Sequence, residues 1–150
     1  TRIYANYVAT HVATFEEVPP DEAEMRSRFD AIRAQRLPWL VALRGSSVVG
    51  YAYVGLYRAR AAYRYTCENS VYVDASTCGL GIGRALLDVL APRAAACGFR
   101  QMIAVIGDSD NAASIALHRA AGFEPVGTLK RVGYKFNRWI DVVLMQRALP

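Results

Sequence analysis

The stretch that decides the fold lies in the middle of the chain and reads Val71-Tyr72-Val73-Asp74-Ala75-Ser76-Thr77-Cys78-Gly79-Leu80-Gly81-Ile82-Gly83-Arg84. Its first three residues are typical of the end of a β-strand, and residues 84–96 predict an α-helix. Glycines between the two allow a tight turn and let a ligand approach the backbone closely. The unpaired amides at the helix start therefore favour a phosphate or pyrophosphate ligand.

The glycine spacing fits neither of two common nucleotide-binding patterns. A dinucleotide fingerprint requires G-x-G-x-x-G, but the sixth position is Arg84 when counting starts at Gly79 and Leu86 when it starts at Gly81. A Walker-type loop requires a lysine after its last glycine, whereas Arg84 follows Gly83 here. An ordinary tight turn without a ligand is the simpler alternative.

Outside this stretch, helical periodicities alternate with short apolar runs. The periodicities predict helices near residues 3–8, 21–35, 84–96 and 112–121. The apolar runs predict strands at residues 39–43, 48–57, 65–73, 102–106, 123–129 and 140–149. This order predicts a mixed α/β (α+β) fold, with a single mixed central sheet flanked by helices, in one domain spanning residues 1–150.

The composition excludes several classes of protein. Hydrophobic residues make up 53% and charged residues 21%, which argues against a disordered chain. No apolar run approaches the roughly 20 residues needed to cross a bilayer, and no secretory leader opens the sequence. The three cysteines form neither a close pair nor a metal-ligand spacing, so we expect reduced thiols in the cytoplasm and no metal.

The net charge of +5 has two interpretations. One is an ordinary basic surface, and the other is an electrostatic attraction for an anionic ligand. Because the basic residues are scattered along the chain, the sequence does not favour a nucleic-acid partner.

Two segments together resemble the Gcn5-related N-acetyltransferase (GNAT) superfamily. Residues 78–83 match its acetyl-CoA pattern Q/R-x-x-G-x-G/A, except that Cys78 stands where Gln or Arg is usual. Residues 111–123 match the pattern N-x-x-(A/S)-x-x-(L/F)-(Y/H)-x-x-x-G-F, although Asn111 alone would be an ordinary helix N-cap. The resemblance implies acetyl-CoA as co-substrate, bound by Val71, Tyr72, Val73, Gly79, Leu80, Gly81, Ile82, Gly83, Arg84, Asn111 and Ser114.

Over nearly its whole length, the chain is similar to the phosphinothricin and methionine sulfone/sulfoximine acetyltransferase group within that superfamily. Matching stretches include Thr14-Phe15-Glu16, Tyr57-Arg58-Ala59-Arg60, Thr66-Cys67-Glu68-Asn69-Ser70 and Gly133-Tyr134-Lys135-Phe136. This resemblance implies acetyl transfer to the α-amine of a small amino-acid analogue by direct attack on the thioester, in a homodimer. Members of the group begin with a strand before the first helix, and this chain opens directly at that helix.

The resemblance also implies roles for two titratable side chains. Glu68 is the expected general base, acting directly or through a water; its alternative is a structural carboxylate paired with Arg58, Arg60 or Arg64. His118 is the expected acid for the leaving thiolate, and its alternative is a buried, hydrogen-bonded histidine.

The backbone amide of Val73 is the implied oxyanion donor. The implied contacts of the amine substrate are Phe15, Arg60, Tyr63 and Glu68. Guanidinium groups pair well with carboxylate or phosphinate oxygens, although residues 57–65 also fit a solvated basic loop or a nucleic-acid stacking surface. Two other functions compete with this one: a protein or peptide N-acetyltransferase, and a non-catalytic acyl-CoA-binding module.

Overall fold

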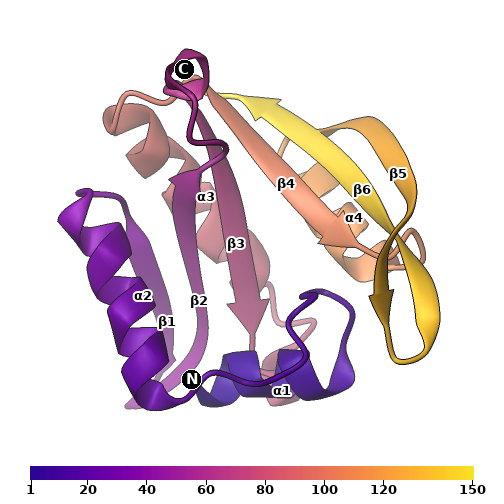
Figure 1. The fold of residues 1–150 in the computed structure, drawn as a ribbon. Helices are drawn as coiled ribbons and strands as arrows, with labels where there is room; N and C mark the ends of the chain where they lie inside the picture. Colours follow the sequence, from indigo (N-terminus) through magenta and orange to yellow (C-terminus); the bar gives the residue numbers. More distant parts are fainter.

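A mixed six-stranded sheet organises the chain in the computed structural model, which describes residues 1–150 (Figure 1). The strands lie in the order β1-β2-β3-β4-β6-β5. They are β1 (Trp39–Arg44), β2 (Ser47–Leu56), β3 (Thr66–Val73), β4 (Gln101–Gly107), β5 (Glu124–Lys135) and β6 (Arg138–Ala148). The helices are α1 (Arg2–Thr10), α2 (Glu22–Ala34), α3 (Ile82–Ala96) and α4 (Ala112–Ala120), with short 3-10 helices at η1 (Ala61–Tyr63) and η2 (Ala75–Thr77). The predicted fold class is confirmed.

The parallel strands β3 and β4 pair only at their first residues. Thr66 lies opposite Gln101, and the last pair joins Glu68 to Ile103. Beyond that pair the two strands separate, and Figure 1 shows them diverging toward the end of the molecule where α1 lies. Residues 69–73 of β3 therefore pair with β2 on one side and face an open gap on the other.

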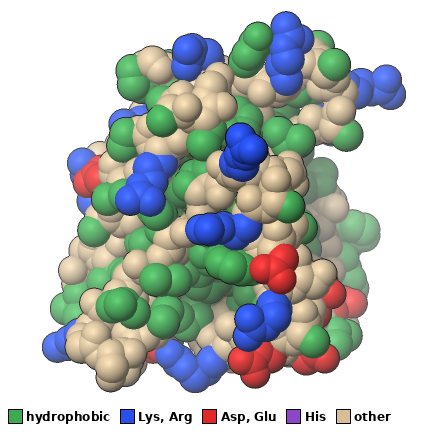
Figure 2. Space-filling view, turned by 90° about the vertical axis from the view of Figure 1, so that its left-hand side faces the viewer, with side chains coloured by type: hydrophobic (Ala, Val, Ile, Leu, Met, Phe, Trp, Pro, Cys, Tyr) green, Lys and Arg blue, Asp and Glu red, His purple; other side chains and the backbone are tan.

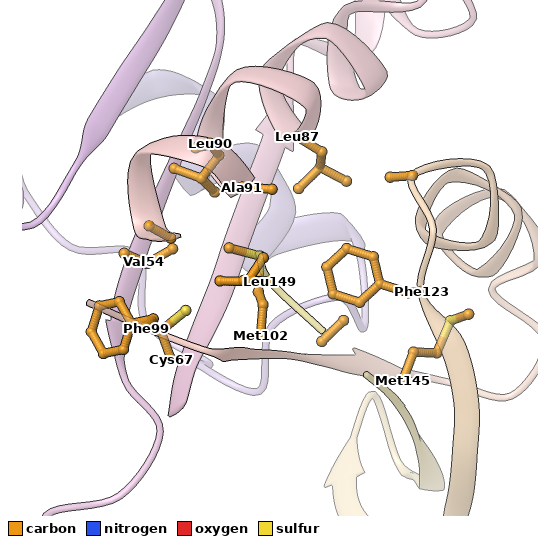
Figure 3. Packing of buried hydrophobic residues seen from close by; sticks show 14 of the residues in the cluster. Val54, Cys67, Leu87, Leu90, Ala91, Phe99, Met102, Phe123, Met145 and Leu149 are labelled. Carbon is orange, nitrogen blue, oxygen red and sulfur yellow. The ribbon is translucent and has the colours of Figure 1, made fainter. Parts of the chain in front are cut away.

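Two hydrophobic clusters lie on opposite faces of the sheet. The larger one has 18 buried residues and joins α3 to the sheet; Figure 3 shows Leu87 and Leu90 projecting from α3 toward the strands that carry Val54 and Met102. The smaller cluster joins α1 and α2 to β2 through Ile3, Tyr4, Val8, Met25 and Tyr51. Because side chains alternate along a strand, neighbouring residues of β2 supply both clusters.

Three local details differ from the sequence-based expectations or extend them. The helix α3 begins at Ile82, two positions before the predicted start. The last two strands are longer than predicted, because β5 and β6 form one hairpin that turns at Phe136 and Asn137. Both of these residues have positive φ, at 52° and 58°, which suits a tight two-residue hairpin turn. That turn was missed because it contains no glycine.

Figure 2 shows the α2–β1 side of the molecule, where Lys and Arg side chains are spread among apolar and neutral ones, with several acidic side chains between them. None of the helices has the length and apolar character of a membrane-spanning segment.

Candidate active site

Two cavities adjoin the gap between β3 and β4. The first, here called the glycine cavity, has a volume of about 380 Å³ and lies against residues 77–84 at the start of α3. The second, here called the Glu68 cavity, has a volume of about 250 Å³ and extends to β4 and the loop before α2. Both are lined by Ala13, Val71, Asn111 and Ser114. A ligand can therefore extend from one cavity into the other at these four shared residues.

The glycine cavity contains the predicted anion site. Gly79 and Gly81 have φ values of 80° and 78°, and a Cβ added to either would meet no atom within 4 Å. Gly81 is the N-cap of α3, so no side chain caps the first amides of this helix. Open space beside uncapped helix amides is what a pyrophosphate requires. The guanidinium of Arg84 lies at the same helix end and pairs with Asp88 at 2.8 Å.

Two backbone amides of β3 face the gap. The amide of Asp74 donates to Val49 of β2 at 2.8 Å, so the alternation along the strand turns the amides of Val73 and Val71 to the other side. The amide of Val73 lies 3.4 Å from the hydroxyl of Tyr7, which itself donates to the Val73 carbonyl at 2.9 Å. Val71 lies where the two cavities meet, whereas Val73 lines only the glycine cavity.

Glu68 is a half-buried carboxylate in the wall of the Glu68 cavity. The predicted alternative was an ion pair with a nearby arginine, but Glu68 is absent from the six salt bridges of the chain. Burial raises the pKa of Glu68 above its usual value, and the charge of Arg58 opposes this only in part. An unpaired carboxylate with a raised pKa is suited to accept a proton near neutral pH.

His118 is 3% exposed and hydrogen-bonded at both ring nitrogens. Nδ1 lies 2.8 Å from the carbonyl oxygen of Ser114, and Nε2 lies 3.0 Å from the side-chain amide of Asn69. A carbonyl only accepts, so Nδ1 carries a proton; burial lowers the pKa of the ring, so Nε2 carries none and accepts from Asn69. These contacts agree with the predicted alternative of a buried, hydrogen-bonded histidine.

The predicted substrate residues are only partly brought together. Phe15 and Glu68 line the same cavity. Arg60 and Tyr63 instead border a shallow pocket beside η1, formed with Tyr57 and Arg58, and do not reach the Glu68 cavity. Within one chain, η1 and the residues before it hold Arg60 and Tyr63 beside this separate pocket.

Sequence reasoning missed three polar residues of this region. Asn69 is 7% exposed, and its pairing with His118 spans 49 residues. Tyr7 belongs to α1 and reaches β3 only because that helix packs across the open end of the gap. Thr14 lines the Glu68 cavity and contacts the Tyr4 hydroxyl at 2.8 Å. Each depends on a tertiary contact, between residues 10 to 66 positions apart, which no local pattern in the sequence reports.

Sequence comparisons find related proteins over nearly the whole chain. The model of the acetyltransferase (GNAT) family matches residues 2–123. A phosphinothricin N-acetyltransferase of Alcaligenes faecalis is 53% identical over 149 residues, covering 99% of this chain and 76% of that protein. An L-methionine sulfoximine/L-methionine sulfone acetyltransferase of Pseudomonas paraeruginosa is 44% identical over 148 residues, covering 98% and 86%.

A solved structure shares the fold closely. The phosphinothricin acetyltransferase of Sinorhizobium meliloti in complex with AcCoA superposes with a TM-score of 0.95 at 50% identity, over 99% of this chain and 80% of that one. The arrangement of strands and helices around the gap is therefore that of a protein solved with AcCoA.

Proposed function

The chain belongs to the acetyltransferase (GNAT) family, and we propose that it transfers the acetyl group of acetyl-CoA to the α-amine of a small amino-acid analogue of the phosphinothricin, methionine sulfone or sulfoximine type. The observation that carries the proposal is Glu68, an unpaired carboxylate in a cavity that meets the glycine cavity at Val71. The names of the relatives supply the substrate class. Residues 1–150 form the N-acetyltransferase domain in this proposal.

The residues that would hold acetyl-CoA fit its chemistry. Residues 79–84 offer uncapped amides to its pyrophosphate. The positive φ of Gly81 favours glycine there, and because glycine has no side chain the space beside these amides stays open. The open edge of β3 at Val71 and Val73 offers backbone groups to its amide-bearing arm. Asn111 is occupied as the N-cap of α4, accepting from the amide of Ser114 at 3.2 Å. Bound there, acetyl-CoA supplies the thioester whose acetyl group is transferred.

Glu68 is the proposed general base. The amine substrate arrives as an ammonium, and its nitrogen attacks only after losing a proton. The Glu68 carboxylate accepts that proton, directly or through a water, before the free amine attacks the thioester carbonyl. The C–N bond then forms, the C–S bond breaks, and the coenzyme leaves as a thiolate that takes up the second proton lost by the nitrogen. Burial that raises the pKa of Glu68 makes it a stronger base than an exposed glutamate.

The oxyanion donor belongs to the gap-facing amides of β3. The family resemblance implies Val73, but its amide lies 3.4 Å from the Tyr7 hydroxyl, and Val73 lines the glycine cavity alone. We favour Val71, whose amide faces the same side and which lines both cavities. A backbone donor of this kind stabilises the charge that develops on the carbonyl oxygen.

The role of His118 as acid for the thiolate stays a prediction. In the observed hydrogen-bond pattern Nε2 accepts from Asn69 and has no proton to donate. Likewise, a contact of Arg60 or Tyr63 with the substrate stays a prediction, since neither lines the Glu68 cavity within one chain.

We further propose that the protein is a cytoplasmic homodimer. The face of β4 and β6 turned away from α4 has no covering helix, and Ile103, Leu144 and Val126 line a cavity there together with Tyr57 and Tyr63. A second copy would cover this apolar surface. The three free cysteines suit a reducing compartment. Light scattering at micromolar concentration should give twice the chain mass of 16.5 kDa, and a monomer would contradict the dimer.

Incubation of the purified protein with acetyl-CoA and methionine sulfone tests the proposed activity. We expect free thiol and N-acetylmethionine sulfone to appear in equal amounts, measured by thiol titration and mass spectrometry. Thiol release without an acetylated amine would indicate simple hydrolysis. No reaction with any amine, despite acetyl-CoA binding, would support the acyl-CoA-binding module instead.

A further inference from the structure

Lys135 is a buried cation that the proposed chemistry does not use. It is the last residue of β5, and only 2% of its surface is exposed. Its Nζ donates to the carbonyl oxygens of His11 and Thr14, each at 2.9 Å. No carboxylate lies within 4 Å of the ammonium. A buried charge of this kind is costly, so its two carbonyl partners are essential to its environment.

These two hydrogen bonds join the separated halves of the sheet. Residues 11–17, here called the 11–17 segment, follow α1, which packs against β3 in the first half. Lys135 belongs to β5 in the second half. Figure 1 shows the segment after α1 lying across the open end of the gap between β3 and β4. The bonds from Lys135 are the hydrogen bonds that reach this segment from the second half.

Two glycines allow the 11–17 segment to lie directly on the second half. A Cβ added at Gly107 would stand 2.0 Å from the carbonyl oxygen of Val12. A Cβ added at Gly133 would stand 2.3 Å from the ring of Phe15. At Gly107 the backbone of Val12 leaves no room for a side chain, and at Gly133 a methyl group would displace the ring of Phe15. Neither glycine has a positive φ, so both matter here for close approach and not for a special backbone angle. The ring of Phe15 is therefore seated against the backbone of β5.

The other end of the segment is held from the first half. The hydroxyl of Tyr4 lies 2.8 Å from Thr14 Oγ1 and donates to Glu16 at 2.7 Å. Arg28 of α2 pairs with the same Glu16 carboxylate at 2.7 Å. Thr14 takes part in both sets of contacts, through its hydroxyl to Tyr4 and its carbonyl to Lys135, and Phe15 follows it in the chain. Both residues line the Glu68 cavity.

We propose that Lys135 is a positioning residue for the amine substrate, because it holds the backbone that presents Thr14 and Phe15 to the Glu68 cavity. This rests on the proposed function of that cavity. Lys135 acts through the carbonyls of His11 and Thr14 and touches no reacting group. Residues 79–84, which would bind the pyrophosphate, form no hydrogen bond with Lys135, and Ala13 is the single residue of the 11–17 segment that lines the glycine cavity. Loss of Lys135 should therefore weaken the use of the amine and leave the use of acetyl-CoA largely intact.

Steady-state kinetics of Lys135→Met test this inference against Lys130→Met as control. Lys130 lies on the same strand, but its side chain is 71% exposed and pairs with Asp141. For Lys135→Met we expect the KM of the amine to rise by about tenfold or more, with kcat and the KM of acetyl-CoA within about threefold of the wild type. For Lys130→Met we expect both KM values to stay within about twofold.

Gly133→Ala provides an independent perturbation that keeps Lys135, with Gly127→Ala as its control. Gly127 lies on the same strand, and a Cβ there meets no atom within 4 Å. Gly133→Ala displaces Phe15 and should raise the amine KM in the same selective way. In the double variant with Lys135→Met the two effects should be less than additive, since both act on one segment. If Lys135→Met fails to fold, the KM values of Gly133→Ala alone test whether the 11–17 segment positions the amine substrate.

An amine KM that stays at the wild-type value in Lys135→Met and in Gly133→Ala would overturn the inference. A proportional rise in the KM of acetyl-CoA would also overturn it, because it would mean a general loss of structure. These outcomes are distinct from failure of the proposed function, in which the wild-type protein itself would acetylate no amine.

Discussion

The side-chain amide of Asn69 donates a hydrogen bond to Nε2 of His118 across 3.0 Å, in a site where both residues are buried. This contact links β3 to α4 at the edge of the Glu68 cavity. Together with a second hydrogen bond, in which Nδ1 donates to the carbonyl of Ser114 at 2.8 Å, it defines the tautomer of the ring. The neutral ring fits its site, whereas a protonated ring would face an amide donor.

His118→Ala should destabilise the protein in a pH-dependent way. At pH 7.5 we expect the free energy of unfolding to fall by about 2–4 kcal/mol, because the substitution opens a cavity beside Phe123 and leaves Asn69 unpaired. Burial lowers the pKa of His118 in the folded state. The histidine therefore contributes stability above its unfolded pKa, and this is lost as the pH falls through the folded pKa. The difference between variant and wild type should shrink at pH 5, and urea unfolding at the two pH values checks it.

Turnover of the same variant separates the two interpretations of His118. Measured on folded protein, kcat should fall by less than about tenfold if the histidine only holds Asn69 and α4 in place. A loss of about 10²-fold or more, within the range of a missing general acid, would establish it as the proton donor to the thiolate.

Glu68→Gln should lower kcat by about 10²-fold, the scale of a lost general base. The affinity for acetyl-CoA should not change, since Glu68 lies outside the glycine cavity. Glu124→Gln is the matched control, because Glu124 is an exposed glutamate on β5. Full turnover of Glu68→Gln at neutral pH would reduce Glu68 to a structural residue.

The dependence of the wild-type kcat/KM on pH should reflect the pKa of Glu68. A base works only when deprotonated, so kcat/KM should rise as the pH passes upward through the pKa of Glu68. Burial raises that pKa above its usual value, so the rise should be centred above pH 4.5. The kcat/KM of Glu68→Gln should not show this rise with pH. A rise identical to that of the wild type would mean that another group causes it.

Gly81→Asp should abolish binding of acetyl-CoA. The substitution places a carboxylate beside the uncapped amides of α3, where it competes with a pyrophosphate and repels it. Gly45→Asp is the control for backbone strain, because Gly45 has φ of 60° and equally open space in the turn between β1 and β2. Calorimetry should show that the control binds acetyl-CoA with wild-type affinity and that Gly81→Asp does not bind it. Equal affinities of the two variants would mean that the pyrophosphate does not bind at this turn.

The three cysteines should differ in reactivity. Cys67 is fully buried, and burial raises its pKa to about 12, so it should resist iodoacetamide at pH 8. Cys78 and Cys97 are exposed and should react. Because Cys78 lines the glycine cavity, acetyl-CoA should protect it and leave Cys97 unprotected. Peptide mass mapping checks this, and equal labelling of both with acetyl-CoA bound would contradict it.

The parts of the fold that depend on neighbouring residues were predictable from the sequence. Asp21 caps α2 by accepting from the amide of Glu24 at 2.8 Å, as the spacing of an acid and a glutamate predicts. Asn111 caps α4 in the same way. Glycines at 79 and 81 predicted the turn before α3, and the structure gives both of them positive φ.

The parts of the site that depend on long-range packing were not predictable. The separation of β3 from β4 follows from pairing that stops after three residues, and nothing in either strand's composition marks that point. Nothing in the sequence around Lys135 marks it as buried, and its two carbonyl partners lie more than 120 residues away in the chain. Arg60 was assigned to the substrate by resemblance; within one chain it borders a separate pocket beside η1, so its contact with the substrate stays a prediction.

Acetyl transfer to a small amino-acid analogue is tested most directly by the relative kcat/KM of the purified protein for a panel of amines, measured by thiol release from acetyl-CoA. The panel holds methionine sulfone, methionine sulfoximine, phosphinothricin, unmodified methionine, peptides with free N-termini and a polyamine. We expect the highest kcat/KM for the amino acids with tetrahedral, oxygen-rich side-chain groups, and a large loss for methionine, which lacks those oxygens. A much higher kcat/KM for peptides or the polyamine would contradict the small amino-acid substrate.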